Sequence, residues 1–438
     1  MNRIERFVYN TVRHNPGLKK RIRNFYQSIF DLLPTPNSES VYPIVQRPGH
    51  FFGFHDHSPF SADNQRLLSC RFDIPLRMPK PGETLELGYF DGSDLTDYHP
   101  VTETSAWLWH TSCKLQWRGS RSEMIFNDHI DGRNIARVVD VEKSQSRTLA
   151  DSVATCSPDG RWAIGYNFFR VQRYMPGYGY LQEIDDPEIE LKRPLDNGIH
   201  LIDLDNGEIR QLLSIADMAE IQPEPTMDGA WHYCTHAVFS PNSRRFIFLH
   251  RWVHDDFEAR MSRMLSMDIN GGAIHIFPTA GMVSHIGWRG ADEVVAYCRI
   301  HDYDDQYVLF RDQEPDDYAV IGMGQFSSDG HPSFDPSGRW MVTDTYPDRR
   351  RMQNLIIYDV QKRRRLDLAR LHMPKRFQTP RPDCHWACDL HPRWDRQGRY
   401  VCFDASFGGE RSLCTMRIDL NHEHFADGSG PPSQSVLK

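Results

Sequence analysis

The stretch Phe334-Asp335-Pro336-Ser337-Gly338-Arg339-Trp340-Met341-Val342 decides the fold, because the chain repeats its pattern. An aromatic residue, a turn that ends in glycine and a short apolar strand follow one another, which is typical of a tight β-hairpin. Six further copies keep this order, and two of them use Trp-Arg-Gly as the turn. The seven copies are anchored at Phe60, Trp117, Cys156, Phe239, Trp288, Phe334 and Trp394.

The spacing of the anchors predicts the architecture. Successive anchors lie 39 to 83 residues apart, and a four-stranded propeller blade takes roughly 40–50 residues. We therefore expect an all-β fold, a seven-bladed β-propeller with a short N-terminal helix. Several blades carry loop insertions, and the longest insertion falls within residues 170–198 of the third blade. A β-sandwich would not explain seven copies.

Three regions are expected along the chain. Residues 1–40 form a basic amphipathic helix and a linker, residues 41–424 form the propeller, and residues 425–438 form a flexible tail. Residues 1–33 contain seven basic and two acidic side chains, and their apolar residues recur at helical spacing. Such a helix fits an anionic membrane surface or the flank of the propeller, and both alternatives stay open. We find no apolar run of the length that a signal peptide or a bilayer-spanning helix needs.

Composition narrows the partners and the compartment. The net charge of −8 is weakly acidic and argues against a nucleic-acid partner. Nine cysteines, several inside strand-like runs, indicate reduced, buried thiols rather than a disulfide scaffold. We expect a cytoplasmic protein, at the inner face of the membrane if the N-terminal helix binds lipid.

Histidines recur at one position of the repeat, three residues before each anchor. They occupy this position in five of the seven copies, although histidine makes up 21 of 438 residues. Lys114 and Val153 fill the other two copies. Equivalent blade positions lie at one height around the propeller axis, so these side chains are expected to converge on the channel. The five histidines are His57, His236, His285, His331 and His391.

Converging imidazoles suit zinc or another transition metal. Five histidines are too many for one four-coordinate site, so at least one of them is structural, and capping of a turn would explain the rest equally well. The set expected to bind metal is His285, His331, Cys388 and His391, because their blades are adjacent and a thiolate strengthens the site. His236 is the first substitute.

Four segments resemble the propeller-type polysaccharide lyases, which comprise the oligogalacturonate lyases and the ulvan lyases. The likeness spans roughly residues 45–420, and it is carried by residues 107–110, 175–180, 331–340 and 388–394. The resemblance implies a propeller with a metal held by histidines of adjacent blades. It also implies cleavage of a uronate-containing glycan by β-elimination.

The two groups of lyases differ in what the metal does. In the oligogalacturonate lyases a metal takes part in catalysis, whereas in the ulvan lyases a zinc is structural and histidine and tyrosine catalyse. Asp389-Leu390-His391 departs from the His-Pro-His pattern of the oligogalacturonate lyases, so one ligand histidine is missing. A structural zinc is therefore expected ahead of manganese or calcium.

β-Elimination needs a group that neutralises the carboxylate, a base for the α-proton and an acid for the leaving oxygen. His110 and His129 lie at opposite ends of a hairpin in the second blade, and the resemblance makes one the base and the other the neutralising group, without deciding which. The candidate acids are Tyr174 and Tyr178. Arg193 is expected to grip a carboxylate or sulfate, and Tyr233 is a further candidate. Packing explains His110 and Tyr178 equally well, and a turn position explains His129. Tyrosine, arginine and histidine together in a cleft also describe a sugar-binding surface without catalysis.

Two functions remain open from the sequence. The first is a lyase that acts on an acidic glycan. The second is a non-catalytic propeller that binds glycan or protein in the biosynthesis of cell-surface polysaccharide. A peptidase is excluded, because no Gly-x-Ser-x-Gly segment follows the blades.

Overall fold

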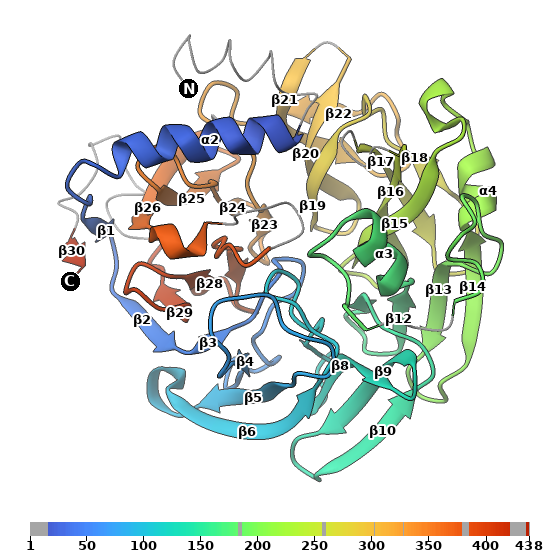
Figure 1. The fold of residues 1–438 in the computed structure, drawn as a ribbon, viewed down its shortest axis with the longest axis horizontal. Helices are drawn as coiled ribbons and strands as arrows, with labels where there is room; N and C mark the ends of the chain where they lie inside the picture. Colours follow the sequence, from blue (N-terminus) through green and yellow to red (C-terminus); the bar gives the residue numbers. More distant parts are fainter. Residues whose placement is uncertain are drawn as a thin grey trace.

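The computed structural model describes residues 16–182, 186–255, 260–301, 303–326, 328–378, 385–420 and 435–437. Seven antiparallel sheets surround one axis (Figure 1), which confirms the expected seven-bladed propeller. Each repeat copy lies where expected, in or beside the innermost strand of a blade.

The first three blades each have four strands in chain order from the axis outwards. Blade 1 contains β3 (His50–Phe51), β4 (Leu67–Arg71), β5 (Leu85–Asp91) and β6 (Asp97–Thr104). Blade 2 contains β7 (Gln116–Trp117), β8 (Glu123–Ile130), β9 (Arg133–Asp140) and β10 (Gln145–Leu149). Blade 3 contains β11 (Thr155–Cys156), β12 (Trp162–Gly165), β13 (Gly198–Asp203) and β14 (Ile209–Ser214).

Blades 4 and 5 follow the same plan. Blade 4 contains β15 (Trp231–Phe239), β16 (Arg245–Val253), β17 (Met261–Asp268) and β18 (His275–Ile276). Blade 5 contains β19 (Val283–Arg289), β20 (Glu293–Ile300), β21 (Tyr303–Arg311) and β22 (Tyr318–Val320).

The last two blades join the two ends of the chain. Blade 7 contains β27 (Arg393–Trp394), β28 (Tyr400–Ala405) and β29 (Ser412–Arg417), and β2 (Ile44–Pro48) supplies its outer strand and so closes the ring. Blade 6 contains β23 (Ser333–Phe334), β24 (Trp340–Asp344), β25 (Met352–Asp359) and β26 (Arg364–His372). Its outer edge is extended by β1 (Ser38–Ser40) and then by β30 (Ser435–Leu437), a strand within the stretch expected to be a flexible tail.

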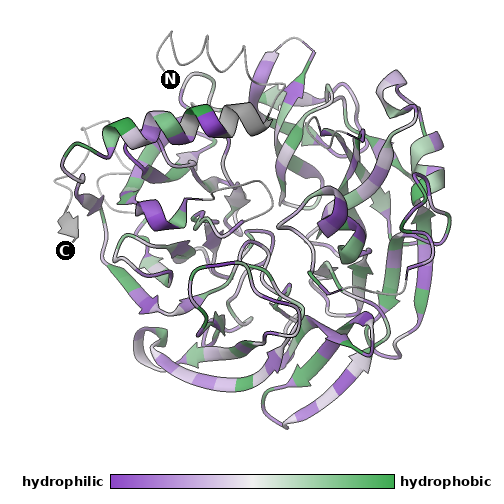
Figure 2. Cartoon of the chain, viewed as in Figure 1, coloured by the Kyte–Doolittle hydropathy of each residue, from purple (hydrophilic) through white to green (hydrophobic). Residues whose placement is uncertain are grey.

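The core lies between neighbouring blades. Every residue of β16 and of β24 is buried, because the sheets of a propeller are covered on both faces. Apolar clusters join adjacent blades, as when Trp340 and Leu355 of blade 6 meet Trp394 and Phe403 of blade 7. The outermost strands β6 and β10 are mostly exposed and mostly hydrophilic (Figure 2).

Short helices lie before the first blade and in the connections between strands. They are α2 (Pro16–Phe30), α3 (Phe168–Tyr174), α4 (Ile215–Glu220), η1 (Ser93–Leu95), η2 (Pro225–Met227) and η3 (Lys375–Phe377). The long insertion of blade 3 joins β12 to β13 and holds α3, whose first turn is capped by the side chain of Asn167. Helix α2 packs on blade 6, so one side of the expected basic helix does lie on the propeller flank. Residues 1–15 of that helix fall outside the described residues. In the described part of the chain, no helix combines the length and the apolar character needed to cross a bilayer.

Candidate functional site

Four of the five repeated histidines meet at the axis, as the repeat predicts. The ring centroids of His285 and His331 are 4.1 Å apart, those of His331 and His391 are 4.3 Å apart, and those of His236 and His285 are 6.4 Å apart. The Phe54 ring packs against this group, 5.0 Å from the His236 ring and 5.2 Å from the His391 ring. Four adjacent blades, 4 to 7, thus contribute one imidazole each to a buried ring.

Irregular backbone turns these side chains toward the axis. His236 and His285 each lie at an interruption of strand pairing, in β15 and β19 respectively. Such bulges commonly re-aim a side chain beside a functional site. His236 and His391 also have left-handed backbone, with φ of 58° and 45°, which a residue other than glycine keeps only where its surroundings enforce it. The chain therefore accepts local strain to hold these imidazoles.

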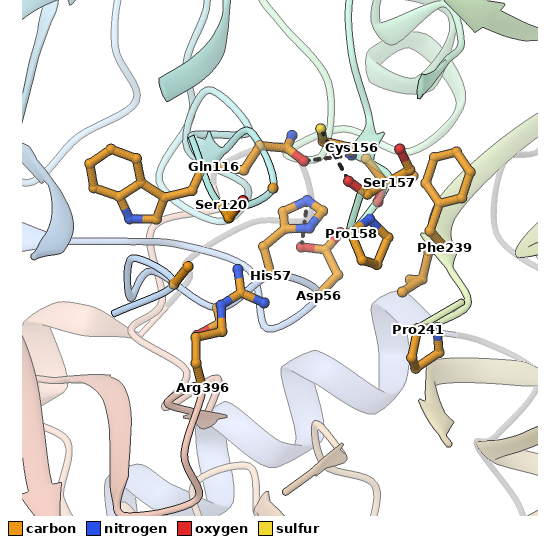
Figure 3. A pocket seen from close by; sticks show the side chains of 16 residues that line it. Asp56, His57, Gln116, Ser120, Cys156, Ser157, Pro158, Phe239, Pro241 and Arg396 are labelled. Atoms are coloured by element: carbon orange, nitrogen blue, oxygen red, sulfur yellow. Dashed lines mark hydrogen bonds and ion pairs between the residues drawn. The ribbon is translucent and has the colours of Figure 1, made fainter. Parts of the chain in front are cut away.

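His57 is the exception, and the expectation that it joins the ring is wrong. Its Nε2 donates a hydrogen bond to the carbonyl of Ala154 at 3.1 Å. The ring lines a cavity of about 440 Å³ together with Asp56 and Arg396 (Figure 3). Asp56 forms an ion pair with Lys114, whose ammonium lies 5.4 Å from the Phe54 ring. In this pair the Asp56 carboxylate and the Lys114 ammonium neutralise each other. His57 therefore belongs to this cavity and not to the group of histidines at the axis.

Two histidines that the repeat does not mark complete the cluster. His55 replaces His57 in the ring and lies 5.2 Å from the His331 ring. His385 packs against His110 at 4.5 Å, and His110 in turn lies 4.7 Å from His391. In the sequence, His55 stands two residues before the repeat position that His57 occupies, and this closeness is the one feature that could have indicated it. No pattern marks His385, which follows a stretch outside the described residues.

Hydrogen bonds fix the tautomers of the imidazoles. Nδ1 of His331 donates to Asp344 at 2.7 Å, Nδ1 of His391 donates to the carbonyl of Gly53 at 2.8 Å, and Nδ1 of His285 donates to Asp329 at 3.0 Å. Metal-binding histidines are held in this way, with the other nitrogen left for the metal. Among the described residues, the buried Nε2 atoms of His331 and His391 have no hydrogen-bond partner. These nitrogens fit a divalent cation.

A carboxylate lies beside the same nitrogens. His110, Asp389 and His391 offer ligand atoms that all lie within 4.8 Å of one another, and all three residues are buried. His391 therefore belongs both to this group and to the row that it forms with His331 and His285. Asp389 and His110 were not expected as metal ligands, although Asp389 stands two residues before His391 in the sequence.

Cys388 is not brought to the histidines. Its side chain packs in an apolar cluster with Met373 and Phe377, and burial raises the pKa of its thiol to about 12. Successive side chains point in opposite directions along extended backbone. Cys388 therefore points away from the site that Asp389 and His391 face. The expectation of a thiolate ligand is contradicted by this packing.

Of the tyrosines expected at the site, Tyr178 reaches the cluster, and Tyr346, which was not expected, lies 5.6 Å from the His331 ring. The Tyr178 ring lies 4.4 Å from that of His110 and 5.5 Å from that of His385, and the side chain is half-buried at the rim. Burial raises the pKa of Tyr178 to about 12, so its hydroxyl stays protonated. Neither ring nitrogen of the buried His110 has a hydrogen-bond partner within the described residues. A protonated phenol and a neutral imidazole are therefore in ring contact.

Three expected residues lie elsewhere and have other partners. His129 hydrogen-bonds with Asn134 at 3.2 Å across the β8–β9 hairpin. The Tyr174 hydroxyl donates to the carbonyl of Ile189 at 3.2 Å, and Arg193 forms an ion pair with Glu220 at 2.7 Å. These contacts favour structural roles for His129, Tyr174 and Arg193.

An arginine that the sequence does not single out brings positive charge near the site. Arg251 lies opposite Tyr233 in the pairing of β15 with β16. The Arg251 Nε donates to Thr235 at 3.1 Å. Burial, and then the charge of Arg251, lower the pKa of His236 well below its usual range. An arginine on a strand gives no sequence signal, because most such side chains point to solvent.

Burial also sets the protonation of the imidazoles. It lowers the pKa of His110, His331 and His391 well below 6.5, and neighbouring imidazoles add to the effect. The cluster is therefore neutral near pH 7. Neutral imidazoles are the form that accepts a proton or binds a metal.

Gly177 controls the place of His385, and its replacement gives a direct test. A Cβ at Gly177 would lie 2.6 Å from the Cβ of His385, and the backbone φ is +97°. We expect Gly177→Ala to lower the free energy of unfolding by about 1–3 kcal/mol more than Gly82→Ala, because overpacking adds to the backbone strain. Gly82 has a φ of +83° and open space around its Cβ. Chemical denaturation measures both variants, and equal losses would contradict the close packing of His385.

Comparisons with known proteins support the fold. No family model matches the chain, and no curated protein matches its sequence. Among solved structures, an oligogalacturonate lyase from Vibrio parahaemolyticus aligns with a TM-score of 0.58 and 14% identity, covering 87% of this chain and 93% of that one. An oligogalacturonate lyase in complex with manganese aligns with a TM-score of 0.57 and 13% identity, covering 88% of this chain and 98% of that one. The chain thus has the propeller fold of the oligogalacturonate lyases.

Proposed function

We propose that this protein is a lyase that cleaves a uronate-containing acidic oligosaccharide by β-elimination, assisted by a divalent metal. The observation that carries the proposal is the contact between His110 and Tyr178, a buried imidazole without a hydrogen-bond partner among the described residues and a protonated phenol, whose ring centroids are 4.4 Å apart. The fold shared with oligogalacturonate lyases supports it.

His110, Tyr178 and Arg251 match the steps of the reaction. A neutral imidazole, His110, takes the proton from the carbon next to the carboxylate. The electron pair of that C–H bond forms a carbon–carbon double bond while the neighbouring C–O bond breaks. The leaving oxygen takes the proton of the Tyr178 hydroxyl. The guanidinium of Arg251 offsets the charge that develops on the carboxylate, which is usually the largest contribution to such a reaction.

A metal fits beside these groups. His331 and His391 would hold it through Nε2, and Asp389 stands close enough to His391 to complete the site. A divalent cation there supplies Lewis acidity toward the substrate carboxylate. Imidazole and carboxylate ligands suit manganese as well as zinc. Without the Cys388 thiolate, the site has no soft ligand that would favour zinc. We propose manganese or zinc as the bound ion.

Metal content gives the first test of this assignment. We expect the purified protein to carry about one transition-metal ion per chain, and His331→Ala and His391→Ala to lose most of it, since each removes a nitrogen ligand. His57→Ala is the matched control, because this imidazole lines the cavity with Asp56 and Arg396. The variant should keep the metal. Elemental analysis of the purified variants measures the content. Full metal in both ring variants would remove these histidines from the site.

Activity is tested by the ultraviolet absorbance of the unsaturated uronate product, on a panel of acidic polysaccharides and their oligosaccharides. We expect Tyr178→Phe to lower kcat by about 10²-fold, as the loss of a general acid does. Tyr174→Phe should stay within a few-fold, because that hydroxyl serves the carbonyl of Ile189. A chelator should abolish the activity and the metal should restore it.

The opposite result has a definite meaning. If folded, metal-loaded protein gives no absorbance on any substrate yet binds an acidic oligosaccharide in calorimetry, the lyase assignment is wrong. The protein is then a glycan-binding propeller, the alternative that the sequence leaves open.

A further inference from the structure

Helix α2 meets different surroundings on its two sides. A helix turns 100° per residue, so Phe25 and Ile29 lie within about 40° of one another, and Gln27 lies on the other side. Leu32 and Leu33 follow just after the helix, which ends at Phe30. The exposed fractions of Phe25, Ile29 and Leu32 are 71%, 50% and 86%. With Leu33, which is also exposed, these residues form what we call the apolar stripe. Four large apolar side chains thus face solvent within nine residues.

The opposite side of the helix is fastened to blade 6. The Gln27 amide donates to the carbonyl of Asp348 at 2.8 Å. Arg351, which is buried, pairs with Asp31 at 2.8 Å, and Lys375 of η3 pairs with Asp31 at 3.1 Å. In Figure 1, α2 lies across the strands of blade 6. These contacts fix which side of the helix is turned out, so the exposure of the stripe follows from the fold.

Basic residues occur in the sequence of the helix and on blade 6 beside it. The helix carries four basic residues and no acidic one, in the sequence Pro16–Phe30, while the whole chain has a net charge of −8. Blade 6 adds exposed basic side chains at the docking place, Arg349, whose guanidinium lies 5.3 Å from the Phe30 ring, and Lys375 and Arg376 of η3. An acidic protein therefore has a basic helix sequence and exposed basic side chains of blade 6 next to its exposed apolar residues.

We propose that the apolar stripe of α2 docks this protein onto an anionic membrane surface. An apolar face flanked by basic residues inserts at the boundary of headgroups and acyl chains, and the basic side chains bind the anionic lipids. A second copy of the chain fits less well, because pairing two stripes would bring the same positive charges together. The contact also orients the propeller, since η3 holds α2 through Lys375 and holds the segment of His385 through Trp386, whose indole donates to the carbonyl of Arg376 at 3.2 Å.

The test is co-sedimentation of the full chain with vesicles. We expect binding to vesicles of equimolar phosphatidylglycerol and phosphatidylcholine, and weak binding to phosphatidylcholine alone. The double variant Phe25→Ser/Leu32→Ser should lower the partition coefficient on the anionic vesicles by about tenfold or more, because two large apolar contacts are lost. Raised salt should also weaken the binding.

Two controls keep the result specific. Leu195→Ser changes another exposed apolar residue, 64% exposed and far from α2 in the sequence, and should bind as the unchanged protein does. Sedimentation velocity of both variants without lipid reports folding and self-association. Absence of binding to the anionic vesicles, or binding that the double variant keeps, would overturn the proposal. A dimer that the double variant dissociates would also overturn it and assign the stripe to a second copy.

Discussion

Asp344→Ala should lower the free energy of unfolding by about 3–5 kcal/mol and empty the metal site at the same time. The Asp344 carboxylate is buried and accepts from the backbone N–H of His331 at 2.8 Å, from its Nδ1 at 2.7 Å and from the backbone N–H of His391 at 3.1 Å. Alanine leaves these three buried donors without a partner, at about 1–3 kcal/mol each. The same change frees two imidazoles that the carboxylate positions.

A second buried aspartate separates stability from site geometry. Asp359 accepts from Arg339 and from the backbone of Gln361, at the other end of blade 6. Asp359→Ala should also destabilise the protein, and it should keep the metal. Denaturant unfolding and elemental analysis of the two variants measure both effects. Equal metal content in Asp344→Ala and Asp359→Ala would show that Asp344 does not organise the histidines.

The propeller could be predicted because its signals are local. Each hairpin copy fixes its own turn, and the count of copies fixes the number of blades. The convergence of His236, His285, His331 and His391 follows from the same repetition. What the repeat cannot supply is the direction of a side chain beside a bulge, since a slip of one residue reverses the face on which it lies.

The error at Cys388 has that origin, because Asp389, one residue further along the chain, faces the site in its place. His55 takes the place expected of His57, which is a shift of two residues that the repeat does not reveal. Arg193 fails for a different reason, because its partner Glu220 lies 27 residues away and no pattern connects the two. Asp344 and Arg251 were missed because a buried charge on a strand is visible only once the strands are packed.

Acid should unfold this protein steeply between about pH 6 and pH 5. Burial lowers the pKa of His50, His57 and His232 to about 4 each, from 6.5 in the unfolded chain. Between these values the unfolded chain binds more protons than the folded one, so stability falls as the pH falls below 6.5. At pH 5 each of the three costs about 2 kcal/mol, and together they approach the total stability of an ordinary domain.

Other groups change the size of this effect without changing its sign. Six more buried histidines have pKa values well below 6.5 and add to the loss: His55, His110, His236, His250, His331 and His391. Asp344 acts in the opposite direction, because burial raises its pKa to about 7 and the folded state takes up its proton first. Its contribution at pH 5 is about 3 kcal/mol, which offsets between one and two of the nine histidines. The net loss therefore remains large.

The variant His57→Gln shows whether proton uptake by buried imidazoles causes the unfolding. A glutamine amide can keep the hydrogen bond to the carbonyl of Ala154, and it has no proton to gain. We expect the midpoint of acid unfolding, followed by tryptophan fluorescence, to move to lower pH by a few tenths of a unit and to involve about one proton fewer. His99→Gln is the matched control, since the His99 side chain is half exposed at its contact with Asp91. Two outcomes would contradict the prediction: a midpoint that moves equally in both variants, or a free energy of unfolding that stays constant from pH 7 to pH 4. Either would mean that the buried histidines are not held neutral. The histidines of the metal site could then not be treated as neutral nitrogen ligands.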